Sequence, residues 1–408
     1  MDILNVKDTP VFDDSIWDLE YLTHYPYASS KLGNNDEIQI PINHQDSQPL
    51  ISESCVYLEG RVTKKDGTVG TTVPFINNPM SFLFEEVRLE VSGVTVDSTK
   101  RLGVTSTMKA LVSYSPNESN KLQMSGWVAP SETTIKPNTT GDFDFYIPLK
   151  FWLGLAEDYA HVFLGQSIVL VLRRSATDND AIIAPEGTTE QQLDWKMDLT
   201  KIAWRVPHVR MSDKHRLAML KQINSDEEIV MAFRSWETHY YPLLPTTQKH
   251  SWAIKSSNYL ERIRYLLFGL QKNRSNSITK NAGLFDHCGL VNCTVYVNEK
   301  RFPYDSLQIS FKKKRFTRAY DAIARFQSSY FGKTDFPLLS PKQFADSYAI
   351  IVVDCSKQNE SVKASVVDVR IEFETDENIP ASTSAYACIL HDKIVTYTPL
   401  TSVVRHVV

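Results

Sequence analysis

The chain has 408 residues, enough for two domains of about 200 residues each. Hydrophobic residues make up 42% and charged residues 23%, a composition that excludes intrinsic disorder and is typical of a folded protein. The net charge of −4 means that the chain has no overall positive charge to attract nucleic acid or anionic lipid. No apolar run approaches the roughly 20 residues of a membrane-spanning helix.

Residues 1–35 mix acidic and aromatic side chains without any sustained periodicity. We therefore predict an irregular N-terminal arm that docks on a neighbouring protein, with Trp17, Tyr21 and Tyr25 as candidate inter-subunit contacts. An acidic arm cannot neutralise phosphate, so contact with a genome should be weak or indirect. The first residues also lack the basic and apolar regions of a secretory signal, which favours folding in a reducing compartment.

From residue 36 the pattern is mainly β, and we assign residues 36–208 to a first jelly roll. The stretch VRLEVSGVTVD (87–97) alternates apolar and polar residues on both sides of Ser92-Gly93, which predicts a β-hairpin. Apolar residues in the stretch 104–112 then recur at helical spacing, so a short helix should follow the hairpin.

The segment FDFYIPLKFWLGLAED (143–158) is the most aromatic part of the first domain. Phe143, Phe145 and Ile147 alternate, so we expect them on one face of a strand. The residues after Pro148 should leave the strand and pack near a domain or subunit boundary. Phe151 and Trp152 are therefore candidate inter-subunit contacts as well.

Residues 209–227 are predicted to bridge two domains. The stretch SDKHRLAMLKQIN (212–224) is charged and reads as a helix, with Ser212 or Asp213 as its N-cap. Residues 228–408 then form the second jelly roll.

The second half repeats the order of elements in the first. LFEEVRLEV and LFDHCGLVN begin 201 residues apart, DFYIPL and DSYAII 202 apart, and IVLVL and VRIEF 201 apart. Three pairs in the same order support a duplicated β domain. One continuous amphipathic helix is expected over FTRAYDAIARFQSSY (316–330).

Together these elements predict an all-β fold, with two jelly-roll β-sandwiches in tandem (a double jelly roll) and a few short helices. Long loops such as 174–192 should lie on the surface.

We predict no catalytic residues, no metal ligands and no cofactor. The sequence contains neither His-Glu-x-x-His nor Gly-x-Ser-x-Gly. Cys288 and Cys293 would point to opposite faces of a strand, so two buried thiols are expected there and not a metal site. The five cysteines are scattered and odd in number, unlike a disulfide framework.

The run FKKKRFTR (311–318) is the one strongly basic stretch. It is a weak candidate for a phosphate or nucleic-acid patch, although a solvated corner between a strand and a helix is the favoured interpretation. The basic residues are Lys312, Lys313, Lys314, Arg315 and Arg318.

Several stretches along the chain resemble double jelly-roll major capsid proteins, the lineage of adenovirus hexon and the tectivirus shell protein. The resemblance is closest to virus-like capsid proteins of invertebrate genomes and of Polinton- or adintovirus-like elements. The stretches that carry it include NNDEIQIPI (34–42), SFLFEEVRLEVSGVTVD (81–97), FYIPLKFWLGLAEDY (145–159), GLFDHCGLVNCTVYVNEKRFPYDSL (283–307), YAIIVVDCSKQNES (348–361) and IPASTSAYACILHDKIVTYTPLT (379–401).

The resemblance implies a major capsid protein without enzymatic activity. Three chains would form a pseudo-hexameric trimer, and trimers would tile an icosahedral shell around the genome, often over an inner membrane. The implied partners are other copies of the chain and minor capsid or penton proteins. The implied location is the virion capsid, after synthesis in the cytoplasm or nucleus of a host cell.

Two alternatives stay open at this point. The chain could be a β-sandwich module that binds carbohydrate or a host receptor, for which DNDAIIAPE (178–186) is the stretch to inspect. It could also be an enzyme on the same fold, which would require a deep pocket with convergent histidines or acids.

Overall fold

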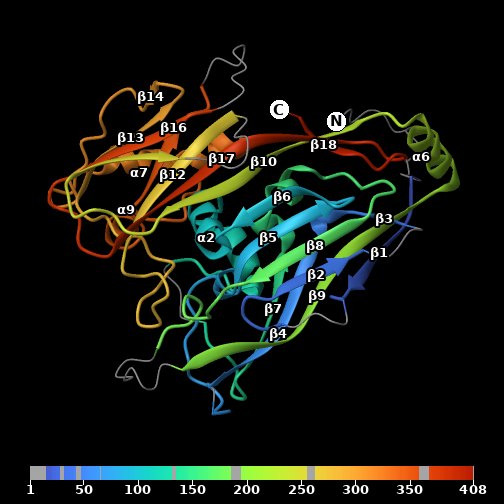
Figure 1. The fold of residues 1–408 in the computed structure, drawn as a ribbon, viewed down its shortest axis with the longest axis horizontal. Helices are drawn as coiled ribbons and strands as arrows, with labels where there is room; N and C mark the ends of the chain where they lie inside the picture. The colour runs from blue at the N-terminus through green and yellow to red at the C-terminus, as the bar shows by residue number, and fades with distance from the viewer. Residues whose placement is uncertain are drawn as a thin grey trace, which may run out of the picture.

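The computed structural model describes residues 15–27, 32–42, 47–64, 66–130, 135–184, 194–254, 262–357 and 367–407. Within these ranges the chain forms four sheets, two from each half of the sequence (Figure 1). The strands of the first half are β1 (Ile16–His24), β2 (Glu37–Pro41), β3 (Gln48–Pro49), β4 (Cys55–Lys64), β5 (Phe84–Val91), β6 (Val94–Lys100), β7 (Asp142–Pro148), β8 (Ile168–Arg174) and β9 (Trp195–Met211).

The second half contributes a matching set of strands. They are β10 (Ile229–Tyr241), β11 (Lys249–Ile254), β12 (Arg262–Lys272), β13 (Leu290–Val297), β14 (Lys300–Phe302), β15 (Ile350–Asp354), β16 (Val369–Thr375), β17 (Thr383–Tyr397) and β18 (Val404–Val407).

The strand order is the same in both halves. Sheet 1 runs β1-β9-β4-β7 and sheet 2 runs β2-β8-β5-β6, whereas sheet 3 runs β10-β17-β12-β15 and sheet 4 runs β11-β16-β13-β14. Sheets 1 and 3 each have a fifth strand outside this order, since β3 pairs with β9 and β18 with β17. The eight antiparallel strands that remain in each half, with these crossovers, make a jelly roll. The predicted fold, two jelly rolls in tandem with short helices, is therefore confirmed.

The spacing of the repeat is uneven along the chain. β8 and β16 lie 201 residues apart at both ends (369 minus 168, and 375 minus 174), as the sequence predicts. The hairpin turns lie farther apart, since the β5–β6 turn begins at Ser92 and the β13–β14 turn begins at Asn298, 206 residues later. The alignment of Leu83 with Leu284 at 201 residues therefore misses a five-residue insertion. Both turns use two residues with positive φ, as tight hairpins require.

The prediction that residues 1–35 form an irregular arm is wrong for residues 16–24. They form strand β1, which pairs antiparallel with β9 from Ile16 opposite Met211 to His24 opposite Trp204. Periodicity is hidden here because side chains on both faces of β1 are exposed, so apolar and polar residues do not alternate. Residues 1–14 lie outside the described residues, and the other predicted domain limits stay predictions.

Short helices join the sheets. They are α1 (Pro79–Phe82), α2 (Leu102–Ser113), α3 (Pro116–Lys121), α4 (Leu149–Trp152), α5 (Gly154–Asp158), α6 (Asp213–Ser225), α7 (Thr317–Ala324), α8 (Phe326–Phe331) and α9 (Pro341–Asp346), with 3₁₀ turns η1 (Ile51–Glu53) and η2 (Leu122–Ser125).

Two helix predictions have different outcomes. α6 bridges β9 and β10 with Ser212 in the N-cap position, as expected, and none of its residues is buried. The single helix expected over 316–330 is instead two helices, α7 and α8, interrupted at Arg325. Ile323, Phe326 and Tyr330 of the predicted stripe are buried.

The core lies between the paired sheets. Phe143, Phe145 and Ile147 alternate inward along β7, as predicted, with exposed fractions of 8%, 7% and 1%. Burying three such side chains contributes roughly 1.5–3 kcal/mol each. Four tryptophans are among the largest fully buried side chains: Trp127, Trp152, Trp204 and Trp236.

Candidate assembly surfaces and the interdomain junction

A polar and aromatic junction joins the two jelly rolls. The first jelly roll contributes β6, α2 and α5, and the second contributes its edge strand β10 together with α8. In Figure 1, α2 lies between the two pairs of sheets. Because elements of both halves contact each other at this junction, the two jelly rolls are packed together and are not separate domains joined only by a linker.

The strongest polar contact in the junction joins Arg234 on β10 to Asp158 at the end of α5. The Arg234 side chain donates to both Asp158 oxygens at 2.6 and 2.8 Å, and its backbone N–H donates to the same carboxylate at 2.8 Å. Nη1 also donates to the carbonyl of Tyr330 at 2.7 Å, and the guanidinium lies 3.9 Å from the Tyr330 ring centroid. One arginine thus ties a helix of one domain to a strand and a helix of the other.

A second ion pair is more deeply buried. The Lys109 side chain on α2 is 1% exposed, and its Nζ lies 2.8 Å from Glu157 and donates to the carbonyl of Lys150 at 2.8 Å. The ammonium also lies 5.8 Å from the ring of Trp236 on β10. Sequence reasoning missed this pair, although Lys109 is the one charged residue of an otherwise uncharged helix, and that is a usable signal for a buried partner.

The backbones approach closely at Gly154, the first residue of α5. A Cβ atom there would lie 1.8 Å from the carbonyl oxygen of Arg234. Only glycine permits this distance, so α5 rests directly on β10.

Phe151 and Trp152 are buried inside the single chain. Each is 1% exposed, Phe151 stacks near Tyr114, and the Trp152 indole donates to Ser81 at 2.7 Å. The prediction of inter-subunit contacts is therefore wrong for these two rings. They lie where expected in one respect, since α4 continues into the α5 segment at the domain boundary.

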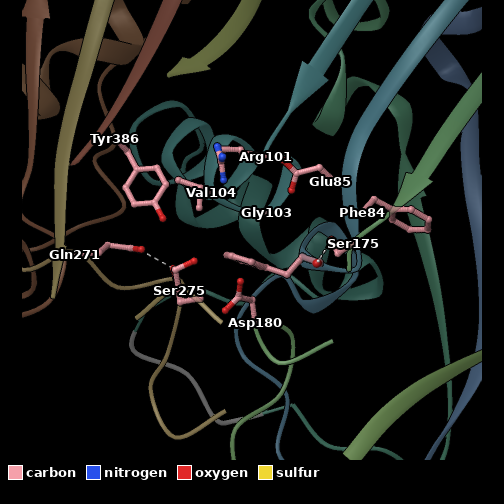
Figure 2. Close-up of a pocket in the computed structure, with 12 residues that line it drawn as sticks. Phe84, Glu85, Arg101, Gly103, Val104, Ser175, Asp180, Gln271, Ser275 and Tyr386 are labelled. Carbon is pink, nitrogen blue, oxygen red and sulfur yellow. Dashed lines mark hydrogen bonds between the residues drawn. The ribbon is translucent and has the colours of Figure 1, made fainter. Parts of the chain in front are cut away.

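A small cavity lies within the junction (Figure 2). Its volume is about 50 Å³, room for a few water molecules but not for a substrate. Arg101 of its lining stacks 4.1 Å above Tyr240, and the Asp180 carboxylate accepts from the backbone N–H of Asn276 at 2.6 Å. Burial raises the pKa of Asp180 in spite of that hydrogen bond.

The stretch 178–186 offers no calcium-type cluster in its described part. Asp178 is buried in an ion pair with Arg174 at 2.8 Å and accepts from the backbone N–H of Met197 at 2.9 Å. Asp180 lines the junction cavity and accepts the hydrogen bond from Asn276. These acids hold the fold together, while residues 185 and 186 lie outside the described residues.

The candidate contacts Trp17, Tyr21 and Tyr25 are exposed, with fractions of 74%, 48% and 57%. Tyr21 belongs to a row across the outer face of sheet 1, where the Arg205 guanidinium lies 5.6 Å from the Tyr21 ring and 5.9 Å from Tyr146. Large exposed side chains on an edge strand are typical of a protein contact surface.

The basic run forms a tight turn before α7. Lys312 pairs with Asp376 at 3.1 Å and also with Glu377, so one of the five cations is already neutralised. The remaining four are exposed, and the turn has the form of the solvated corner that was favoured. Phosphate binding by this patch stays a prediction.

None of the five cysteines, all of which lie within the described residues, forms a disulfide. Cys293 is fully buried on β13, and burial raises its pKa to about 12, whereas Cys288 precedes that strand. Among the residues that the structure describes, no group of three or more His, Cys, Asp or Glu could hold a metal. Within the same residues, no helix is long and apolar enough to cross a membrane.

Comparison with solved structures gives the same fold. A chain of the Sputnik virophage structure aligns with a TM-score of 0.63, at 10% identity over 100% of this chain and 91% of the other. A PBCV-1 virus capsid chain aligns at 0.61, with 10% identity over 98% and 99%. The mavirus major capsid protein aligns at 0.57, with 10% identity over 99% and 92%.

The sequence comparisons are of two kinds. No curated protein matches the chain. A family model described as a double jelly roll-like domain matches residues 73–395, which is most of the sequence. The matched range begins within the first jelly roll and ends on β17, so it includes the junction between the two sandwiches. The chain therefore belongs to the double jelly roll-like domain family.

Proposed function

We propose that this protein is a viral major capsid protein that self-assembles into trimers and then into an icosahedral shell. The observation that carries the proposal is the pair of jelly rolls with identical strand order, locked side by side by a buried junction. Three such chains present six similar sandwiches, which is the outline needed to tile a hexagonal lattice.

The structural neighbours support the same proposal. They come from the PBCV-1 virus capsid, the Sputnik virophage and the mavirus major capsid protein, and each aligns over nearly the full chain. The proposal includes contacts of the shell with penton or minor capsid proteins. It also allows an inner membrane beneath the shell.

The test is to express the full chain and determine its mass in solution by light scattering, followed by negative-stain microscopy. We expect a homotrimer of roughly 140 kDa, three times 46.5 kDa, with a hexagonal outline. Shells or flat hexagonal arrays should form as the protein concentration is raised. A chain that remains monomeric at high concentration and physiological salt would overturn the proposal.

A further inference from the structure

The outer faces of sheet 1 and sheet 3 are covered differently, although their strand orders are equivalent. On β4 of sheet 1, buried and partly exposed residues alternate, whereas the equivalent β12 of sheet 3 is buried without interruption from Tyr265 to Gln271. β7 alternates in the same way, while its equivalent β15 has four consecutive buried residues. One face of sheet 1 is thus open where the corresponding face of sheet 3 is closed.

On sheet 3, α7 packs on β15 and Phe326 of α8 packs near Trp236, while further cover along the edge comes from the first jelly roll. Its β6 and α2 run along the edge strand β10, where Thr105 donates to Thr238 at 2.7 Å and Arg101 stacks on Tyr240. In sheet 1, β1 holds the edge position that β10 holds in sheet 3. By this equivalence, the face of β1 should be covered by the counterpart of β6 and α2.

That counterpart is the segment from β14 through α7 in the second jelly roll. β14 is equivalent to β6, and α7 follows it as α2 follows β6. All residues of α2 are buried, whereas only Ala319 and Ile323 are buried on α7. Tyr304, between β14 and α7, is 88% exposed. The β14–α7 segment is therefore exposed in the single chain, as β1 is. By the equivalence of the two halves, these two surfaces should cover each other.

The two surfaces cannot meet within one chain. β1 and the β14–α7 segment lie at opposite ends of the molecule (Figure 1). A contact between different patches on two identical subunits is head-to-tail, and such a contact closes into a ring when the rotation permits.

We infer that β1 of one copy docks on the β14–α7 segment of a second copy, which repeats between chains the junction seen inside the chain. This inference rests on the proposed function. Leu19 and Tyr21 share the outer face of β1, Trp17 extends from its bulge, and these side chains supply the apolar part of the contact. The partner supplies Tyr304 and the exposed side of α7.

The same equivalence assigns a role to the basic turn. Arg101 immediately precedes α2 and stacks on an aromatic ring at the end of β10. Residues 311–316 occupy that position before α7 and Arg318 lies in its first turn, while Tyr25 and Tyr27 follow the end of β1 with exposed fractions of 57% and 51%. An arginine of this turn, Arg315 or Arg318, stacks on one of these rings in the neighbouring copy. This assigns one arginine of the basic run to a protein contact, and phosphate binding by the other exposed cations stays a prediction.

The decisive experiment is site-specific photo-cross-linking in the full chain. A benzophenone amino acid replaces Tyr21, and these chains are mixed with ¹⁵N-labelled chains without the probe before trimers form. We expect cross-linked peptides that join residue 21 to residues 303–318 of a labelled chain. A trimer whose cross-links map to other surfaces would overturn this inference and leave the capsid proposal standing, whereas a chain that forms no oligomer would overturn both.

Charge substitutions provide the second measurement. Leu19→Asp should abolish the trimer at concentrations where the wild-type chain is fully trimeric, since an apolar contact would then have to bury a carboxylate. Leu217→Asp is the matched control, because Leu217 is also exposed, at 61%, but lies on α6 and belongs neither to β1 nor to the β14–α7 segment. Circular dichroism should show that both variants fold. Equal trimer populations for the two variants would contradict the docking of β1.

Discussion

The ion pair between Arg234 and Asp158 should be the largest single polar contribution to the junction. Arg234→Met keeps an unbranched apolar stem but removes the guanidinium and leaves the Asp158 carboxylate without its cation. Both side chains are mostly buried, with exposed fractions of 27% and 16%. Breaking a buried pair costs about 3–5 kcal/mol, and we take the lower end because neither group is fully enclosed.

The magnitude can be converted to a melting temperature. For a folding unit of 150–250 residues, 1 kcal/mol shifts Tm by about 2–4 °C, so a loss of about 3 kcal/mol lowers it by roughly 6–12 °C. Differential scanning calorimetry of the full chain at neutral pH is the assay. Adding Asp158→Asn to Arg234→Met should recover part of the loss, since it removes the stranded carboxylate.

The matched control is Arg61→Met. Arg61 on β4 also pairs with an aspartate, Asp142, at 2.5 Å, but the two side chains are 49% and 39% exposed. Solvent screens such a pair, so its loss should leave Tm unchanged within error. The reasoning fails if Arg234→Met lowers Tm no more than Arg61→Met does.

Two further predictions concern packing and pH. Gly154→Ala places a methyl group against the Arg234 carbonyl and should lower Tm by several degrees. In the control Gly33→Ala, the new methyl group meets only the flexible Asp36 carboxylate, at 3.1 Å, so Tm should change little. Equal shifts in Tm for the two variants would contradict the close approach of α5 to β10. Burial lowers the pKa of His391 despite nearby Glu237. The unfolded chain then binds more protons, so stability is complete above about pH 6.5 and falls as the pH drops below it. His391→Gln should flatten the Tm profile between pH 7 and 5, and an unchanged slope would argue against this group.

Local patterns in the sequence were sufficient for several elements. The β5–β6 hairpin follows from alternation around Ser92-Gly93, α2 follows from apolar residues at helical spacing, and α6 follows from its cap and charge. The tandem jelly rolls follow from the repeated order of such elements. Each of these depends on interactions between residues close in sequence, which is why spacing alone reveals them.

Other features depend on contacts between distant segments. β1 has no alternating pattern because side chains on both of its faces are exposed in the single chain. Phe151 and Trp152 could not be assigned to the interior or to a subunit contact from their residue type. Arg234 meets Asp158 across 76 residues and Lys109 meets Glu157 across 48 (157 minus 109), pairings that no spacing rule encodes.

The sequence by itself therefore determined the kind of element at most positions and the duplication of the domain. Only the tertiary structure decided which faces of the equivalent sheets are covered. The physical reason is that burial depends on what packs against a face, and in a duplicated protein two similar strands, β1 and β10, receive different neighbours. β10 is covered by the first jelly roll, whereas β1 is uncovered in the single chain and is the strand that we propose docks on a second copy.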